Sequence, residues 1–299
     1  MIGFHPRSVL KESDIGIACV FPSSSVTMIG EWFCIWGVES MDGVGNPSND
    51  WLTHRELETV APLREYVECS WILGTHSRSE KAVKRILPDG CLDFFLVGGG
   101  GLFLSGSVAS YTLMTMNPGE EVVGVRFRWG MAPPLLGLPA EEVSGTAVPA
   151  EIVWPDDARR LAEEMLELET TETRLSALHV YLCDRVKHGR SRREPDRAIG
   201  HAAALLGASP LGIPVSSLAD SLGLSERQLE RRFLNSIGCS PKRFARVVRF
   251  QRLLALRREH RMHPDWAALA LDAGYADQAH MINDVRELTG VTPTMLLEQ

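Results

Sequence analysis

The last hundred residues repeat one pattern of apolar and polar positions. In the first copy an apolar helical stretch ending at Leu222 runs into Gly223, and a second stretch places Leu229 and Phe233 on one face. Both apolar positions recur 52 residues later, whereas Gly223 recurs 51 residues later as Gly274, so one residue has been added in the second turn. The pattern predicts a pair of short helices with a tight turn, a helix-turn-helix, used twice.

Capping residues mark the start of the second helix in the first copy. Gly223 tolerates the left-handed backbone that ends a helix, and Ser225 offers a side-chain oxygen to the free amides of the next one. Gln228, three residues after Ser225, completes a capping box. With Leu229 and Phe233 facing inward, four polar residues face outward. They are Glu226, Arg227, Glu230 and Arg231.

Charge divides the chain unevenly. Residues 190–299 hold 16 Lys and Arg against 12 Asp and Glu, a net charge of +4, although the whole chain carries −7. Between Ser225 and Arg261 the balance is 11 basic against 3 acidic residues. Because neutralised phosphates supply most non-specific affinity for nucleic acid, this stretch is the expected electrostatic footprint for duplex DNA.

The repeated segment also carries a family resemblance. Its first part runs over residues 224–233 and 238–244, and its second over residues 273–280 and 290–293. These runs resemble the AraC family of bacterial transcription regulators, and the resemblance covers residues 200–297. It implies two helix-turn-helix units, joined by a long helix, that read adjacent major-groove segments on one face of double-stranded DNA.

The resemblance places DNA-binding candidates on both second helices and on the joining helix. Because Asn283 is followed by Asp284 and Glu287, whose carboxylates repel phosphate, we predict that the first unit supplies most sequence discrimination. On the joining helix, arginines recur every three residues from Arg243 to Arg252, a spacing that drifts by about 60° per step. Some of them should therefore contact phosphates and others should brace neighbouring helices. The candidates are Arg227, Gln228, Glu230, Arg231, Lys242, Arg243, Arg246, Gln278, His280 and Asn283.

Upstream, short apolar runs separated by turn residues predict an antiparallel sheet. The expected strands cover residues 66–73, 82–87, 91–97, 102–104 and 122–129, with Gly98 to Gly101 as a hairpin turn. Together with the repeated segment this gives an α+β fold class. A small antiparallel β sandwich or barrel-like domain with flanking helices precedes an all-α domain of two helix-turn-helix units joined by a long helix.

Three segments follow from these patterns. Residues 85–93 and 124–130 resemble the uncharacterised amino-terminal domain of one AraC-family branch, which implies a sensor or dimerisation domain over residues 50–189. Residues 190–299 form the expected DNA-binding domain. Residues 1–49 are an extension of uncertain status: the true start lies at Met28 or Met41, or the segment is disordered, or it is ordered by its aromatic residues. Amphipathic helices over 155–168 and 172–188 either pair two copies of the chain or cover the sheet.

Other chemistry has weaker support. The six cysteines form no Cys-x-x-Cys pair, so we expect reduced thiols in the cytoplasm and neither a metal site nor another cofactor. No stretch approaches the ~20 apolar residues that span a membrane. Asp89, Asp93, Arg126 and Arg128 either line a polar pocket or, as we favour, include a buried turn aspartate paired with a strand arginine.

The sequence thus predicts a non-enzymatic transcription regulator that binds duplex DNA and responds to an unidentified small-molecule effector. RNA polymerase and a second copy of the chain are candidate partners. The main alternative is an enzyme fused to a DNA-targeting module, such as an alkyl-transferring repair protein with Cys69 or Cys91 as nucleophile. That reaction needs a base beside the thiol, and only His54 and His76 are at hand, without a recognisable motif.

Overall fold

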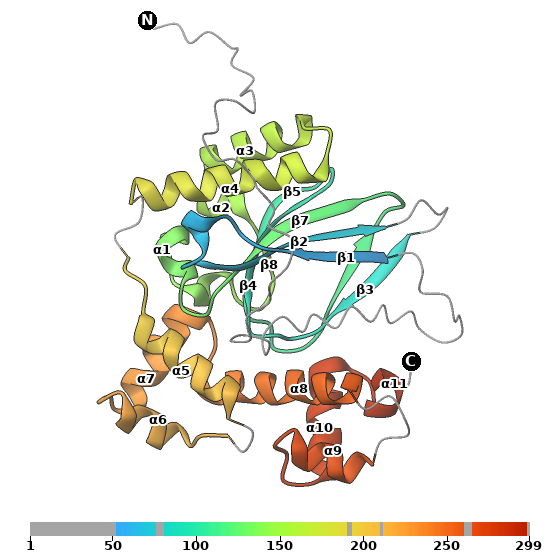
Figure 1. Cartoon of the computed structure of the whole chain (residues 1–299), viewed down its shortest axis with the longest axis vertical. Coiled ribbons are helices and arrows are strands. Elements are labelled where there is room, and N and C mark those ends of the chain that lie inside the picture. The colour runs from blue at the N-terminus through green and yellow to red at the C-terminus, as the bar shows by residue number, and fades with distance from the viewer. Residues whose placement is uncertain (1–51, 76–80, 190–192, 210–211, 260–264, 298–299) are drawn as a thin grey trace, which may run out of the picture. The chain divides into compact units, whose positions relative to one another are not determined.

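A computed structural model describes residues 52–75, 81–189, 193–209, 212–259 and 265–297. The expectations for residues 1–49 and for Cys19 and Cys34 fall outside these ranges. The described part contains an antiparallel sheet with helices, followed by helices alone (Figure 1). The predicted α+β fold class is therefore confirmed.

The main sheet has six antiparallel strands in the order β1-β2-β7-β4-β5-β8. β2, β4 and β7 lie inside the sheet and are buried along most of their length, which explains their nearly continuous apolar sequences. β4 and β5 form the hairpin predicted at the glycine run, with Val97 paired to Gly101. The strands are β1 Leu52–Leu57, β2 Val67–Thr75, β4 Leu92–Val97, β5 Gly101–Ser105, β7 Glu121–Phe127 and β8 Ala147–Pro149.

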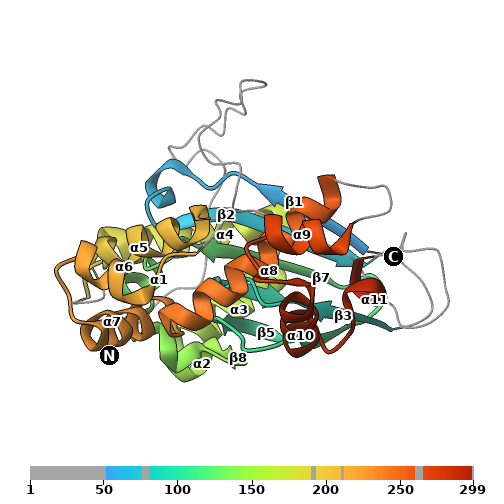
Figure 2. The same cartoon turned by 90° about the horizontal axis from the view of Figure 1, so that it is seen from below.

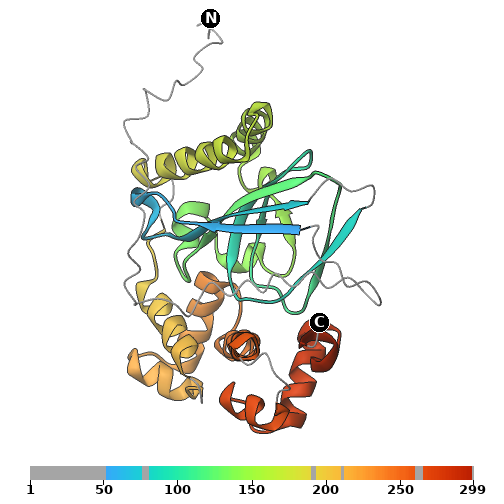
Figure 3. The same cartoon turned by 45° about the vertical axis from the view of Figure 1, so that its right-hand side comes forward.

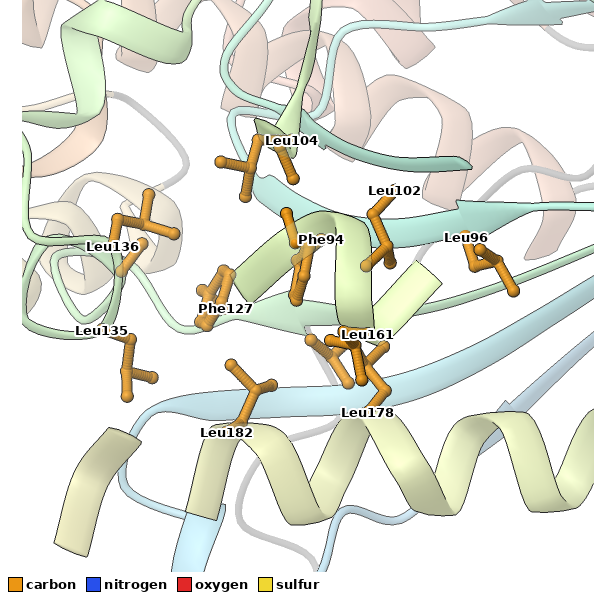
Figure 4. Packing of buried hydrophobic residues seen from close by; sticks show 14 of the residues in the cluster. Phe94, Leu96, Leu102, Leu104, Phe127, Leu135, Leu136, Leu161, Leu178 and Leu182 are labelled. Carbon is orange, nitrogen blue, oxygen red and sulfur yellow. The ribbon is translucent and has the colours of Figure 1, made fainter. Parts of the chain in front are cut away.

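One face of this sheet packs against two helices, α3 (Pro155–Glu167) and α4 (Thr171–Lys187) (Figures 1 and 3). Figure 4 shows side chains from strands and helices meeting there, with Phe94 and Phe127 on the sheet facing Leu178 and Leu182 on α4. Burial of each such side chain contributes about 1.5–3 kcal/mol relative to exposure. The two amphipathic helices thus cover the sheet, which was one of the two interpretations of their sequence.

The other face packs against a two-stranded ribbon of β3 (Ala82–Ile86) and β6 (Thr112–Met116). Trp71 and Phe95 from the sheet and Met116 from the ribbon form a smaller core between the two layers. Sheet and ribbon together make the small sandwich that the strand pattern predicted. Short elements complete this region, namely η1 Ala61–Leu63, α1 Ala132–Leu136, η2 Ala140–Val143 and α2 Ala150–Val153.

A buried ion-pair network links the main sheet to the loop between β3 and β4. Nη2 of Arg126 lies 2.7 Å from Asp89 Oδ2, and its Nε lies 3.1 Å from Asp93 Oδ1. Burial alone lowers the pKa of Arg126, but the two carboxylates more than reverse this, so the guanidinium stays charged. The pairing of a turn aspartate with a strand arginine is confirmed.

The carboxy-terminal helices form two bihelical units at the two ends of α8 (Figure 2). The first unit has its own core around Leu229, Phe233 and Phe244, and the second around Phe250, Met281 and other apolar residues. α8 contributes side chains to both cores. The helices are α5 Arg197–Ala208, α6 Val215–Ser221, α7 Glu226–Ile237, α8 Pro241–Glu259, α9 Trp266–Asp272, α10 Gln278–Thr289 and α11 Pro293–Leu297.

Candidate nucleic-acid interface

α7 begins where its capping residues predicted. Ser225 Oγ accepts a hydrogen bond from the Gln228 amide, and Gln228 Oε1 accepts one from the Ser225 amide at 2.9 Å, so the capping box is formed. Gly238 ends the helix with a φ of 90°. The Gln228 side chain therefore contributes to helix initiation, which limits how far it can extend toward a ligand.

The outward face of α7 is polar and exposed. Leu229 and Phe233 are fully buried, whereas Arg227, Glu230 and Arg231 are exposed to solvent. With Ile237, which is also buried, the two apolar residues anchor three successive turns of the helix, and the charged side chains project from its opposite side. This face can supply both hydrogen-bond donors and an acceptor to base edges.

Arg232, which the sequence did not single out, holds α7 in place. Its Nε and Nη2 donate to the two carboxylate oxygens of Asp196 at 2.8 and 2.6 Å, and Asp196 also caps α5 through the Ile199 amide. These hydrogen bonds raise the pKa of Arg232 above its ordinary value. The partner lies 36 positions away, so no local sequence signal distinguishes Arg232 from its exposed neighbours.

The basic residues of α8 differ in whether they bond to a neighbouring helix. Lys242 is exposed and Arg243 half-buried in the first turn, where the Ser240 side chain caps the helix through the Arg243 amide at 3.3 Å. Arg246 instead donates to Asp284 on α10 at 2.9 Å and to Glu287. Arg252 donates to the backbone oxygen of Asp272 on α9. The expectation that some of these arginines brace neighbouring helices is confirmed.

The carboxylates of α10 are therefore partly neutralised from within the domain. Arg249 lies 3.9 Å from Asp284, next to the Arg246 pair, and its guanidinium lies 5.0 Å from the ring centre of Tyr275. Although burial lowers it, the pKa of Arg246 is raised overall by Glu287 and Asp284. The carboxylates of Asp284 and Glu287, which were expected to repel phosphate, are both paired with Arg246. The outer surface of α10 is therefore less acidic than its sequence suggests.

The candidates on α10 point in different directions. Asp277 caps the helix through the His280 amide at 2.7 Å, and Gln278 and Asn283 are exposed. The His280 ring packs edge-on against Tyr275 at 5.3 Å between ring centres and is only half-exposed. Gln278 and Asn283 are thus free to meet a ligand, while His280 also serves the domain core.

Other site types find little support in the described part of the chain. No cluster of three or more metal-ligating His, Cys, Asp or Glu side chains occurs among these residues. None of the described helices combines the length and apolar character needed to cross a bilayer. None of the four cysteines in the described ranges, which are Cys69, Cys91, Cys183 and Cys239, takes part in a disulfide.

Comparison with known families identifies both regions. Residues 218–299 match a family described as "Helix-turn-helix domain", and residues 55–149 match a "Domain of unknown function (DUF6597)". The chain therefore carries an AraC-type helix-turn-helix domain behind a DUF6597 domain, which confirms the resemblance read from its sequence. No curated protein sequence matches the chain.

Among solved structures the chain is distantly similar to ToxT from Vibrio cholerae, with 11% identity, a TM-score of 0.40, and coverage of 83% of this chain and 98% of that one. It is also similar to unsaturated fatty acid bound wild-type ToxT from Vibrio cholerae, with 12% identity, a TM-score of 0.38, and coverage of 85% and 97%. Similarity at this level transfers neither ligand nor activity to the present chain.

Proposed function

We propose that this chain is a transcription regulator that binds specific sequences of double-stranded DNA. The observation that carries the proposal is a pair of equivalent capped helices, α7 and α10, each with an exposed polar face, at the two ends of α8. The stretch from Ser225 to Arg261 is also the most basic part of the chain. A short capped helix with exposed donors is the element that enters a major groove in helix-turn-helix proteins.

The proposed roles follow from exposure and position. Arg227, Glu230 and Arg231 contact base edges from α7, and Gln278 and Asn283 do so from α10, with His280 as a weaker contributor. Gln228, Lys242 and Arg243 lie near the starts of α7 and α8, where amides and cations bind phosphate. Arg246 contacts phosphate only if it exchanges its carboxylate partners for DNA. Residues 50–189 and 190–299 are the proposed sensor and DNA-binding domains.

The test compares one residue from each unit. The full chain is first used to select its preferred duplex from random sequences, and affinities of Arg231→Ala and Asn283→Ala are then measured on that duplex. We expect Arg231→Ala to lose about tenfold to a hundredfold, because a good bidentate base contact contributes about 1–3 kcal/mol. Asn283→Ala should lose less. Arg160→Ala, an exposed arginine on α3, is the matched control and should leave affinity unchanged.

Two results would contradict the proposal in different ways. A larger loss from Asn283→Ala than from Arg231→Ala would reverse the ranking of the two units while leaving DNA binding intact. Failure of the wild-type chain to bind any duplex at modest ionic strength would remove the function itself.

The structure gives less support to the enzymatic alternative. Burial and the neighbouring Asp89 carboxylate raise the pKa of the Cys91 thiol well above its ordinary value, which disfavours the nucleophilic thiolate. Cys69 is also buried, and burial lowers the pKa of His54 to about 4. His76 lies outside the described residues. We therefore propose a non-enzymatic protein, which a methyl-transfer assay on alkylated DNA would contradict by detecting alkylated protein.

We further propose that the amino-terminal domain responds to a small molecule. A surface hollow of about 450 Å³ between α1, α2 and α4 offers a place for one, lined by apolar side chains such as Leu138 and Ile152 and by Arg185. Thermal-shift measurements on the full chain against a metabolite panel test this proposal, and no shift with any compound counts against it. RNA polymerase is a further proposed partner. A second copy of the chain is another, and it would be contacted through the exposed side chains of Leu166 and Val180.

A further inference from the structure

The carboxy-terminal ends of both proposed reading helices lie against the amino-terminal domain. Gly238, which ends α7, has a φ of 90°, and a Cβ atom built there would lie 2.0 Å from Ser144 Oγ and 3.0 Å from the Ala140 oxygen. Gly290, which ends α10, has a φ of 76°, and a Cβ atom there would lie 2.5 Å from Cε1 of Tyr111. The two glycines hold equivalent positions in the repeat, so the same point of each unit is docked.

The contact with α10 is made by Arg85 on β3 and by Tyr111, the residue before β6, and contains two hydrogen bonds. Arg85 Nη1 donates to the backbone oxygen of Thr289 at 2.5 Å, and the Tyr111 amide donates to the oxygen of Leu288 at 2.7 Å. The Arg85 guanidinium also lies 4.1 Å from the centre of the Tyr111 ring. The last carbonyls of a helix have no partners within it and carry its negative dipole end, so an arginine is well matched to them.

A third set of contacts joins the amino-terminal domain to α8, the helix that connects the two units. Gln251 Nε2 donates to the Pro88 oxygen at 2.6 Å, in the loop between β3 and β4, and Phe244 meets the edge of Trp129 at 4.9 Å between ring centres. The same loop is anchored in the amino-terminal domain by the Asp89 pair with Arg126, whose side chain is 2% exposed. The loop that contacts α8 is therefore tied to a buried charge of the main sheet.

From these contacts we infer that the amino-terminal domain is a second bridge between the two helix-turn-helix units, besides α8, and that it sets the spacing of the two DNA segments the chain reads. The inference rests on the proposed DNA binding. Each unit has a separate core, so the angle between them depends on α8 and on whatever else touches both. Arg85 and Tyr111 are positioning residues, because they act on α10 without reaching DNA themselves.

DNA geometry makes this role measurable. Inserting one base pair between two recognised segments moves the second by about 3.4 Å and turns it by about 35°, since a turn takes 10–10.5 base pairs. A pair of units held at a fixed angle cannot follow that rotation, and the second unit loses its contacts. A pair joined by α8 alone, with α10 released from the ribbon, can adjust and keeps more of its affinity.

The experiment uses the full chain carrying Arg85→Ala together with Tyr111→Ala. Affinity is measured on the selected duplex and on versions with one base pair inserted or removed between the segments. Wild type should prefer the native spacing by at least about tenfold, comparable to the cost of a mismatched base pair. The double variant should reduce that preference to about threefold or less. Thr115→Ala, an exposed position on the same ribbon, should leave it unchanged.

The spacing ratio separates this role from general destabilisation, which lowers affinity for every duplex alike. If the double variant does not fold, Arg85→Met removes the bond to Thr289 and keeps most of the packing, and it should lower the ratio in the same direction. An unchanged ratio in a variant that still binds the native duplex overturns the inference and leaves the proposed function standing. Absence of DNA binding by wild type overturns both.

Discussion

His179, in the middle of α4, is a buried histidine held in its neutral form. The residue is 9% exposed, and its Nε2 lies 2.7 Å from the Ser70 hydroxyl on β2. Burial lowers its pKa from 6.5 to about 4. The neutral ring can satisfy Ser70, whereas a charged ring would lack a carboxylate to pair with in this contact.

This shift predicts how stability depends on pH. Between pH 6.5 and about 4 the unfolded chain takes up a proton on His179 that the folded chain does not, so the free energy of unfolding falls as pH falls through that window. The full contribution is about 3 kcal/mol, since one pKa unit corresponds to 1.36 kcal/mol. Urea unfolding between pH 7 and 4.5 measures it.

The matched variant is His179→Gln, which keeps a polar group near Ser70 and cannot titrate. Its stability should depend less steeply on pH than that of wild type, by about one proton. Some dependence remains in both proteins, because burial also lowers the pKa of His54 to about 4. Equal slopes for variant and wild type would show that His179 is not the source of the effect.

At the scale of helices and strands, the sequence predicted the elements whose signals are local. The capping box located the start of α7 to the residue, and long apolar runs located β2, β4 and β7. The sequence did not predict β6, because three of its five residues are exposed. It did not predict β8 either, because that strand is three residues long and is defined by its pairing with β5. β1, with the sequence LTHREL, reads as a polar segment and becomes a strand by pairing with β2.

In the candidate site, too, the sequence predicted the features that depend on local signals and missed those that depend on distant partners. The exposure of Arg227 and Arg231 follows from a helical period of 3.6 residues around Leu229 and Phe233, which a sequence shows directly. The involvement of Arg246 with Asp284 does not, because the two are 38 positions apart and meet only through the packing of α8 against α10. Local periodicity finds the outward face of an element, but it cannot tell which outward charges another element will cover.

The Arg246 pair predicts a loss of stability when the arginine is removed. Asp284 is 11% exposed in its side chain, so Arg246→Met leaves a mostly buried carboxylate with Arg249 as its nearest cation at 3.9 Å. We expect a cost of about 1–3 kcal/mol, below that of a fully buried broken pair, because Arg246 is partly exposed. Urea unfolding of the full chain measures the cost, and Arg246→Lys is the control that should recover part of it. Equal stability of the Met and Lys variants would refute the role.

At the scale of the whole molecule, the charges are separated along the chain. Residues 1–189 carry a net charge of −11, whereas residues 225–261 carry +8. On the proposed function, the basic segment attracts the phosphate backbone and the acidic remainder opposes approach in any other orientation. The total of −7 is then a poor guide to DNA affinity, because screening confines each charge to about 10 Å at ordinary ionic strength.

This view predicts that position, rather than net charge, decides the effect of losing a cation. Lys242→Gln on α8 and Arg160→Gln on α3 each make the chain more negative by one charge, and both side chains are exposed. Lys242→Gln should weaken binding to random duplex DNA and make the slope of log affinity against log salt concentration less steep by about 0.9, the value for one released phosphate contact. Arg160→Gln should change neither quantity. Titrations at several salt concentrations decide the matter, since equal losses from the two variants would mean that overall charge governs binding and that α8 lies away from the DNA.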